Sequence, residues 1–322
     1  RSELMQKRKT IKLTEIRGTK LEIITGTTDF LLEKETAVAI GKFDGVHIGH
    51  RRLLEEIIAQ KKKGRHACVF TFDPSPAVFF KTGDGRELCT REEKRLFLER
   101  MDIDILVEFP LNDVSAAIPA KKFVTDILIN QLNASFVAAG KDLSFGAGGK
   151  GNADLLARMA QEFEIEVKTI DKVCVEEGEV SSTLIRTFVE AGKMQQAEKC
   201  LGIPYPVLGK VSHGKKIGRT IGFPTVNLIP GAGKLLPPAG VYASDVVYRG
   251  MKYQGITNIG TNPTVSEEKN VSVETYILDF GQEIYGEEIE IYLKKFMRPE
   301  RKFESLEALK KQLEEDIRRV VQ

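Results

Sequence analysis

The sequence predicts two folds in succession: an α/β domain with a parallel sheet, followed by a β-barrel with a terminal helix. In the first half, short apolar runs alternate with segments of helical periodicity, the pattern of β-α-β units. After residue 202 the helical signal disappears for about a hundred residues, and strands and turns follow. The segment 306–321 is again an amphipathic helix. We therefore expect helices on both faces of the sheet and a single helix beside the barrel.

Length and composition fit a globular protein of two domains. The chain has 322 residues, of which 42% are apolar and 29% are charged. Its 48 basic and 46 acidic residues leave a net charge of +2, whereas general nucleic-acid binders carry a strong basic excess. This balance favours small-molecule substrates over a nucleic-acid partner.

Cysteine spacing and hydropathy bear on metal sites, disulfides and membrane association. None of the four cysteines forms a C-x-x-C pair, so neither a zinc site nor a disulfide framework is indicated. No apolar run reaches membrane-spanning length, and no signal peptide is visible. We expect a cytoplasmic protein without a membrane partner, and the sequence leaves its oligomeric state open.

The elements of the first half follow from their periodicity. The segment 51–64 has apolar residues at helical spacing, basic residues in its last turn and a glycine that ends it. Further helices are predicted at 91–101, 120–132 and 152–163. Strands are predicted at 36–41, 66–72, 104–109 and 135–140, and the segment 166–170 is strand-like.

The second half begins after one or two helices at 181–202. "YRGMKY" is typical of a β-hairpin with glycine near its turn. Barrel strands are predicted within 207–214, 240–260, 271–280 and 287–296. We place the domain boundary near residue 203, in the proline-containing "IPYP", which gives domains of residues 1–203 and 204–322.

"GKFDGVHIGH" (41–50) lies between a predicted strand and a predicted helix. His47 and His50, three residues apart, point toward the helix N-terminus, where unpaired N–H groups and a partial positive charge attract phosphate. Gly45 and Gly49 let the backbone approach a ligand closely. Taken alone, the motif also fits a tight turn. A zinc site would need a third ligand.

Two further segments carry polar groups suited to phosphate. "SSTLIR" (181–186) places hydroxyls at a helix start and an arginine one turn later, although such a run is also an ordinary N-cap. "GKKIGRTIGFPTVNL" (214–228) is a glycine-rich loop that could wrap phosphates or form a simple turn. Glu274 in "VETYILDF" could face solvent by strand alternation alone.

These segments together resemble one family. "AIGKFDGVHIGHRRLL" is similar to the opening motif of the nucleotidylyltransferase superfamily, and more narrowly to that of bacterial bifunctional riboflavin kinase/FMN adenylyltransferases, the prokaryotic FAD synthetases. The other first-half segments that agree are "TFDPSP", "GKDLSFGAGGKG" and "SSTLIR". In the second half they are "GKKIGRTIGFPTVNL", "ITNIGTNPTV", "VETYILDF" and residues 295–317. The resemblance covers roughly residues 20–320 and implies a Rossmann-like nucleotidylyltransferase domain followed by a riboflavin kinase barrel with a C-terminal helix.

The resemblance also implies roles for residues. In the adenylyltransferase half, His47, His50 and Arg186 would act in catalysis, and Asp142 and Phe145 would contact the flavin. ATP would be bound there by Gly41, Phe43, Asp44, Gly45, Gly49, Ser181, Ser182 and Thr183. In the kinase half, Glu274 would be the base, and Thr225 and Asn227 would hold Mg²⁺. ATP would be bound there by Gly214, Lys216, Gly218, Gly222, Thr225 and Asn227.

The implied function is FAD biosynthesis, in which ATP phosphorylates riboflavin to FMN and then adenylylates FMN to FAD with release of pyrophosphate. Two positions depart from the family pattern. Ser75 replaces the histidine of "FDPHP", and Leu143 replaces the first aromatic residue of "DFxFG". A paralogue with one active half and a flavin- or nucleotide-binding regulator therefore remain alternatives.

Overall fold

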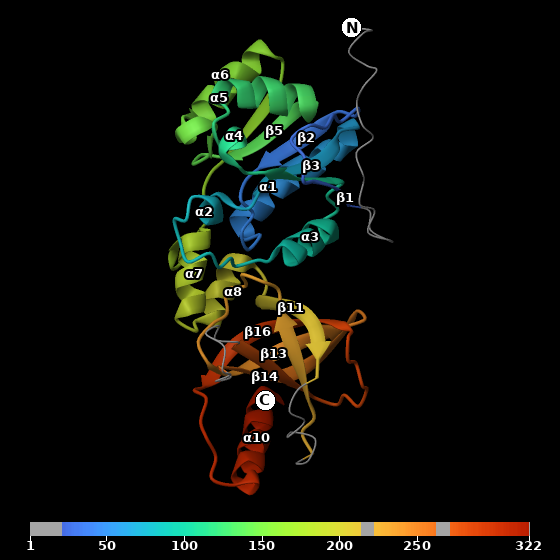
Figure 1. Ribbon diagram of the computed structural model, residues 1–322, viewed down its shortest axis with the longest axis vertical. Coiled ribbons are helices and arrows are strands. Elements are labelled where there is room, and N and C mark those ends of the chain that lie inside the picture. The colour runs from blue at the N-terminus through green and yellow to red at the C-terminus, as the bar shows by residue number, and fades with distance from the viewer. Residues whose placement is uncertain (1–20, 214–221, 262–270, 322) are drawn as a thin grey trace. The chain divides into compact units, whose positions relative to one another are not determined.

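The computed structural model describes residues 21–213, 222–261 and 271–321 (Figure 1). The chain forms two compact units: Arg1–Gly85 with Lys94–Val173, and Arg86–Glu93 with Cys174–Gln322. The second unit thus includes a short segment from the first half of the sequence. The predicted domains 1–203 and 204–322 divide the chain by expected activity, and this boundary stays a prediction.

A six-stranded parallel sheet forms the centre of the first unit, in the order β1-β4-β3-β2-β5-β8. Its strands are β1 (Glu22–Thr25), β2 (Thr36–Ile40), β3 (His66–Asp73), β4 (Ile105–Pro110), β5 (Ala134–Gly140) and β8 (Glu166–Ile170). The predicted parallel sheet is confirmed. The edge strand β1 was not predicted. The residues of β2 are all buried, as expected for a central strand covered on both faces.

Helices cover both faces of this sheet. Val38 and Ile40 of β2 share a core cluster with Phe123 and Leu128, which lie on the helix after β4. The alternate residues of β2 face the other way, where α1 packs on β2, β3 and β5. The helices of this part of the chain are α1 (Ile48–Ala59), η1 (Gln60–Lys63), α2 (Pro76–Phe79), α3 (Arg91–Arg100), α4 (Asp113–Ala116), α5 (Ala120–Lys122), the π-helical η2 (Phe123–Gln131) and α6 (Ala153–Glu162).

Two predicted helices differ in detail from the observed ones. The predicted helix 51–64 begins earlier, at Ile48, and ends in a 3₁₀ turn closed by Gly64 at φ 84°. The predicted helix 120–132 is confirmed, but most of it has π-helical geometry. The earlier start of α1 places His50 inside its first turn.

The strand order creates a topological switch beside β2. β3 and β4 follow β2 in the sequence and lie on one side of it in the sheet. The chain then crosses to the other side of β2, where it forms β5 and β8. Ligands of open α/β sheets bind beyond the carboxyl ends of the strands at such a point. The loops after β2 and β5 therefore flank the expected crevice of this unit.

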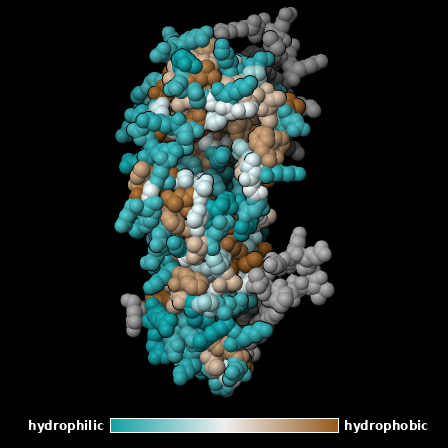
Figure 2. All heavy atoms as spheres, turned by 90° about the vertical axis from the view of Figure 1, so that its left-hand side faces the viewer, coloured by the Kyte–Doolittle hydropathy of each residue, from teal (hydrophilic) through white to brown (hydrophobic). Residues whose placement is uncertain are grey.

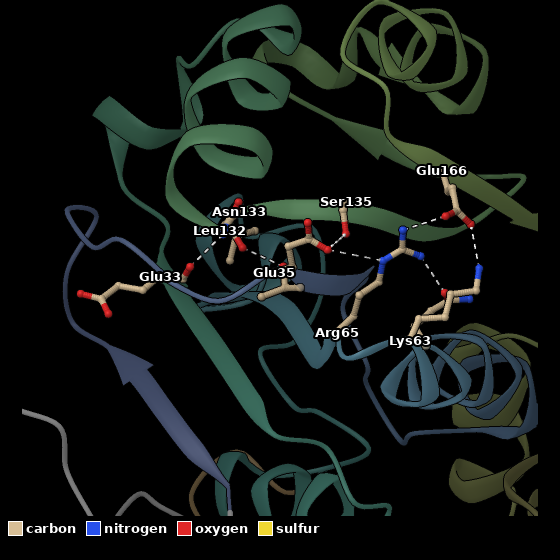
Figure 3. Close-up of polar contacts among 10 residues, drawn as sticks. Glu33, Glu35, Lys63, Arg65, Leu132, Asn133, Ser135 and Glu166 are labelled. Carbon is tan, nitrogen blue, oxygen red and sulfur yellow. Dashed lines mark hydrogen bonds and ion pairs between the residues drawn. The ribbon is translucent and has the colours of Figure 1, made fainter. Parts of the chain in front are cut away.

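Charged side chains join the amino ends of three strands at the opposite edge of the sheet (Figure 3). Arg65 donates one hydrogen bond of 2.7 Å to Glu166 and another of 2.7 Å to Gln60. Its Nε lies 4.0 Å from a carboxylate oxygen of Glu35. Arg65 and Lys63 lower the pKa of Glu166 mainly through these hydrogen bonds. The network lies at the amino ends of these strands, opposite the carboxyl ends beyond which ligands of such sheets bind.

The second unit contains a closed barrel in the order β11-β12-β15-β14-β13-β16. Its strands are β11 (Tyr205–Ser212), β12 (Thr225–Pro230), β13 (Gly240–Tyr248), β14 (Met251–Thr261), β15 (Val271–Ile277) and β16 (Glu288–Arg298). The predicted barrel and hairpin are both confirmed. Arg249 and Gly250 form the hairpin turn with φ of 48° and 77°, the positive values that a type I′ turn requires.

Helices accompany the barrel at both ends of its sequence. The segment 181–202 forms two helices, α7 (Ser182–Glu190) and α8 (Met194–Leu201), separated at Gly192. The predicted terminal helix is α10 (Leu306–Val321). Arg298 at the end of β16 contacts the fully buried Asp316 of α10 at 2.7 Å, which fixes this helix on the barrel.

The hydropathy of the visible surface and of the helices matches the share of charged residues in the sequence. The face in Figure 2 is mostly hydrophilic, with small, scattered apolar areas. Within the described ranges, every helix is too short or too polar to cross a membrane.

Candidate functional site

His47 begins α1 and caps it with its own side chain. Its backbone is extended, with φ −67° and ψ 171°, and its Nδ1 accepts a hydrogen bond of 3.2 Å from the N–H of His50. Because Nδ1 is an acceptor here, the proton of the neutral ring lies on Nε2. His47 therefore has a donor to offer at the phosphate-attracting end of the helix.

His50 stacks on His47, and both rings are buried. The ring centroids are 3.6 Å apart with an interplanar angle of 15°, and the ring of Phe43 lies 5.0 Å from that of His50. Burial lowers the pKa of His47 to about 4. Burial, followed by the charges of His47 and Lys94, holds the pKa of His50 well below its ordinary value. Both imidazoles are neutral at pH 7 in this state.

The loop before α1 has the conformation that its glycines predict. Gly45 has φ 84°, and two non-glycine neighbours, Phe43 and Val46, are also left-handed, with φ of 49° and 43°. Gly49 lies close under the ring of His47, because a Cβ there would be only 3.2 Å from that ring. Backbone strain of this kind is concentrated at functional sites.

Two buried polar atoms near the carboxyl ends of β2 and β3 have no hydrogen-bond partner among the described residues. They are Nδ1 of His50 and the hydroxyl of Ser75. Buried polar atoms normally have a partner, so these two indicate a ligand or water position. Lys94 is also buried here, with its Nζ 3.2 Å from the carbonyl oxygen of Lys42. Lys94 was not predicted to be buried, because a lysine in a charged helix is usually exposed.

The flavin residues expected from the resemblance lie after β5. Asp142 is exposed, and its negative charge raises the pKa of His47 against the larger effect of burial. Phe145 is 4% exposed and packs on Phe123, so its ring belongs to the core of the unit. Leu143 packs against the same core cluster. Asp142 is thus the more accessible of the two predicted flavin contacts.

The other residues predicted to bind phosphate in adenylyl transfer, those of 181–186, lie in the second compact unit. Ser181 is the N-cap of α7 and accepts a hydrogen bond of 3.2 Å from the N–H of Leu184. Ser182 and Thr183 occupy the first turn. Arg186 donates a hydrogen bond of 2.7 Å to the carbonyl oxygen of Arg86. The hydrogen bonds of Ser181 and Arg186 thus join residues of the same compact unit.

The barrel brings three of the predicted kinase residues, Thr225, Asn227 and Glu274, onto one face. In the strand register, Glu274 on β15 lies opposite Asn227 on β12 and opposite Asn258 on β14. All three side chains are half-buried, whereas their neighbours Val273 and Thr275 point into the barrel. Directly opposed side chains of adjacent strands are within contact distance. Thr225 starts β12 on the same side of the strand as Asn227, two residues along.

Asn258 was not singled out in the sequence, because its relation to Glu274 depends on strand register. Its amide donates a hydrogen bond of 3.3 Å to Glu300, in the segment between β16 and α10. A Cβ on Gly260 would lie 2.7 Å from the Glu300 carboxylate, so this carboxylate sits closely over β14. Gly222 has φ 85°, and Gly214, Lys216 and Gly218 lie outside the described residues.

Comparisons with known proteins assign both halves. A model of the riboflavin kinase family matches residues 201–322, and a model of the FAD synthetase family matches residues 31–184. A bifunctional riboflavin kinase/FMN adenylyltransferase from Listeria monocytogenes is 38% identical over 294 residues, covering 90% of this chain and 93% of the relative. The protein of the same name from Escherichia coli K12 is 36% identical over 282 residues, covering 87% and 90%. The one from Bacillus subtilis is 35% identical over 292 residues, covering 88% and 91%.

A solved structure shares the fold over nearly the whole chain. It is described as a macrolide-efflux protein from Streptococcus pneumoniae, with a TM-score of 0.82 and 32% sequence identity. The match covers 92% of this chain and 97% of that chain. That description differs from the names of the sequence relatives, whereas both family models agree with those names.

Proposed function

The chain belongs to the family of bifunctional riboflavin kinase/FMN adenylyltransferases, and from this premise we propose which of its groups carry each reaction. The enzyme phosphorylates riboflavin to FMN with ATP and then adenylylates FMN to FAD. Both catalytic domains are present, so one chain carries both steps.

We assign adenylyl transfer in the first unit to the loop after β2. The observation that supports this most is the stacked His47–His50 pair at the N-terminus of α1, beside the topological switch. In this reaction a phosphate oxygen of FMN attacks the α-phosphorus of ATP. A bond forms between that oxygen and phosphorus, and the bond to pyrophosphate breaks. Since the FMN phosphate is itself the nucleophile, the enzyme has to position the substrates and stabilise charge.

The neutral state of the histidines suits that task. A neutral ring with its proton on Nε2 keeps one N–H group that donates a hydrogen bond to a phosphate oxygen. Negative charge that collects on the phosphates raises the pKa of both rings and draws protons toward them. We give Ser181, Ser182, Thr183 and Arg186 of α7 the same class of role, as hydroxyl, N–H and guanidinium donors to phosphate. Gly41, Asp44 and Asp142 are proposed as backbone and carboxylate contacts of the bound substrates.

We assign the kinase reaction to the outer face of the barrel where β12, β15 and β14 lie side by side. Glu274 is the proposed base for the ribityl 5′-hydroxyl of riboflavin, whose oxygen attacks the γ-phosphorus of ATP while ADP leaves. The strand register carries this assignment, because it places Asn227 and Asn258 on either side of Glu274. We propose that these two neighbouring side chains help to position the carboxylate and the riboflavin hydroxyl from which it accepts a proton.

The donor set of this face fits Mg²⁺. Thr225 offers a hydroxyl oxygen, Asn227 an amide oxygen and Glu274 a carboxylate, and hard oxygen ligands are those that Mg²⁺ prefers. Thr225 and Asn227 are the residues that we propose to hold it, together with ATP phosphates. When bound, the ion neutralises phosphate charge. A cytoplasmic location is proposed as well, because riboflavin, FMN and ATP are water-soluble metabolites.

Product analysis tests the complete assignment. The purified chain is incubated with riboflavin, ATP and Mg²⁺, and in parallel with FMN, ATP and Mg²⁺, and flavins are separated by chromatography. We expect FMN and then FAD in the first mixture, and FAD with pyrophosphate in the second. FMN without FAD in both mixtures would identify the half-active paralogue that Ser75 and Leu143 leave open. Absence of turnover would identify a flavin- or nucleotide-binding regulator.

A further inference from the structure

The segment Arg86–Glu93 belongs to the second compact unit although it lies within the first half of the sequence. Its backbone pairs with the segment between β12 and β13. The N–H of Glu87 donates to the carbonyl oxygen of Gly233 at 2.7 Å, and the N–H of Leu235 donates to that of Glu87 at 2.8 Å. The 86–93 segment is thereby laid along the barrel unit like an additional short strand.

A buried ion pair fixes the C-terminal end of this segment. Lys234 Nζ and a carboxylate oxygen of Glu93 are 2.6 Å apart, and their side chains are 1% and 0% exposed. The Glu93 carboxylate also accepts hydrogen bonds of 3.0 Å from the N–H groups of Thr90 and Leu208. A buried pair of this kind holds its geometry because leaving either charge without the other is strongly unfavourable.

The middle of the segment is fixed by the same lysine. Lys234 Nζ donates a hydrogen bond of 2.7 Å to the carbonyl oxygen of Leu88 and lies 4.4 Å from the ring centroid of Tyr205. The hydroxyl of Tyr205 lies 3.2 Å from the same Leu88 oxygen and 2.7 Å from that of Leu235. One cation and one hydroxyl, both buried, thus hold the backbone of Leu88.

The N-terminal end of the segment holds Arg186. The carbonyl oxygen of Arg86 accepts the hydrogen bond of 2.7 Å from Arg186 Nη2. The Arg86 side chain itself pairs with Glu190, one turn further along α7, at 3.2 Å. The guanidinium is planar and rigid. A hydrogen bond from one of its nitrogens therefore restricts the directions in which its other N–H groups can donate. The position of the Arg86 carbonyl therefore sets the direction of Arg186.

We propose that Lys234, with Glu93 and Tyr205, positions Arg186 for adenylyl transfer by fixing the 86–93 segment. This inference rests on the proposed role of Arg186 in that reaction. Lys234 and Tyr205 lie within residues that the riboflavin kinase model matches, whereas Arg186 does not. The barrel part of the chain thereby orients a side chain that we assign to the other activity.

A double-mutant cycle on the full chain tests the proposal. FAD formation from FMN and ATP is measured for Lys234→Met, for Arg186→Ala and for the double variant, with kcat and KM for ATP separated. We expect Lys234→Met to lower kcat about tenfold in the native background, and less than about twofold once Arg186 is alanine, since coupled residues are not additive. Equal losses in both backgrounds would overturn the proposal.

Matched variants separate positioning from general destabilisation. Asp245→Asn weakens another buried carboxylate of the same unit, which pairs with Lys252 at 2.8 Å on β13 and β14. We expect it to leave the kcat of FAD formation unchanged, and a tenfold loss there would contradict the proposal. If Lys234→Met does not fold, as judged by circular dichroism, Tyr205→Phe enters the same cycle, with a smaller expected loss. Unchanged FAD formation in Arg186→Ala would instead refute the proposed role of Arg186 itself.

Discussion

His50 donates its backbone N–H to Nδ1 of His47 and stacks its ring on the same imidazole at 3.6 Å. The first contact defines where the proton of neutral His47 resides, and the second fixes the plane of the ring. The two residues act as one structural unit at the start of α1. Mutation tests the effect of this arrangement on FAD formation, and pH tests its effect on stability.

The His50→Ala variant should lose FAD formation and retain FMN formation. Removal of the ring deletes one donor to the phosphates and the surface against which His47 stacks. Loss of one such donor lowers kcat about a hundredfold or more. His66→Ala, at the start of β3 in the same unit, is the matched control and should retain both activities. FAD synthesis at the native rate in His50→Ala would exclude the assigned site.

The low pKa of His47 predicts that the protein loses stability as pH falls below 6.5. The unfolded ring takes up a proton near pH 6.5, whereas the folded ring does so only near pH 4. Between these values the unfolded state binds more protons, so the free energy of unfolding decreases with falling pH. From pH 7.5 to pH 5 this ring alone contributes a decrease of about 2 kcal/mol.

Urea unfolding followed by circular dichroism at several pH values measures this change. His47→Gln is the matched variant, because its amide oxygen can still accept the N–H of His50 while it cannot titrate. Its unfolding free energy should depend less on pH between 5 and 7 than that of the native chain. Identical pH profiles for the two proteins would show that His47 is not buried in its neutral form.

The Gly49→Ala variant tests whether the ring of His47 needs its observed position. The new Cβ would lie 3.2 Å from that ring, which cannot retreat easily because His50 holds it on two sides. We expect FAD formation to fall about tenfold with FMN formation unchanged, since small misplacements of catalytic groups are costly. Gly83→Ala, where nothing lies within 4 Å, is the control that should behave like the native chain. A native rate in Gly49→Ala would contradict the required ring position.

Periodicity was sufficient to predict the sheet, the barrel and the histidine loop, because each depends on a local pattern. The buried strand β2, the glycines after it and the start of α1 are adjacent in sequence, so their relation follows from spacing alone. The Arg249–Gly250 turn is equally local. Such features are determined by a few neighbouring residues and carry their own signal.

Tertiary relations were not predictable in the same way. Asn258 lies beside Glu274 only because β14 and β15 pair in one register, and a shift by one residue would turn either side chain to the other face. The partnership of Glu93 with Lys234 joins residues 141 positions apart. Lys94 is buried within a helix whose composition suggests an exposed position. These facts depend on packing, which no single segment encodes.

The Glu274→Gln variant should lose riboflavin phosphorylation and retain FAD formation from supplied FMN. The amide keeps the shape of the side chain but cannot accept the hydroxyl proton, and general-base catalysis contributes about 10²–10⁴-fold. The assay is FMN formation from riboflavin, with adenylyl transfer measured on the same preparation. A native phosphorylation rate would require another base.

The Asn258→Ala variant tests the neighbour of Glu274 that the strand register identifies. It should lower phosphorylation by a smaller factor than Glu274→Gln, about tenfold, because it removes a side chain directly opposite the base rather than the base itself. Gln254→Ala, four residues earlier on β14 and exposed, is the control and should retain both activities. Equal rates for Asn258→Ala and this control would show that Asn258 does not contribute.

Arg65→Met should destabilise the first unit while both activities persist, because Arg65 directly precedes β3, at the amino ends of the strands (Figure 3), whereas the proposed site follows their carboxyl ends. Its side chain is 12% exposed and loses charged hydrogen bonds to Glu166 and Gln60, for an expected cost of about 1–2 kcal/mol in unfolding free energy. Lys63→Met removes the other cation beside Glu166, but that pair is more than half exposed at 3.3 Å and should cost less than about 0.5 kcal/mol. Urea unfolding measures both variants. Equal stabilities of the two would mean that burial of Arg65 adds nothing, whereas a selective loss of FAD formation in Arg65→Met would show that the two edges of the sheet are coupled.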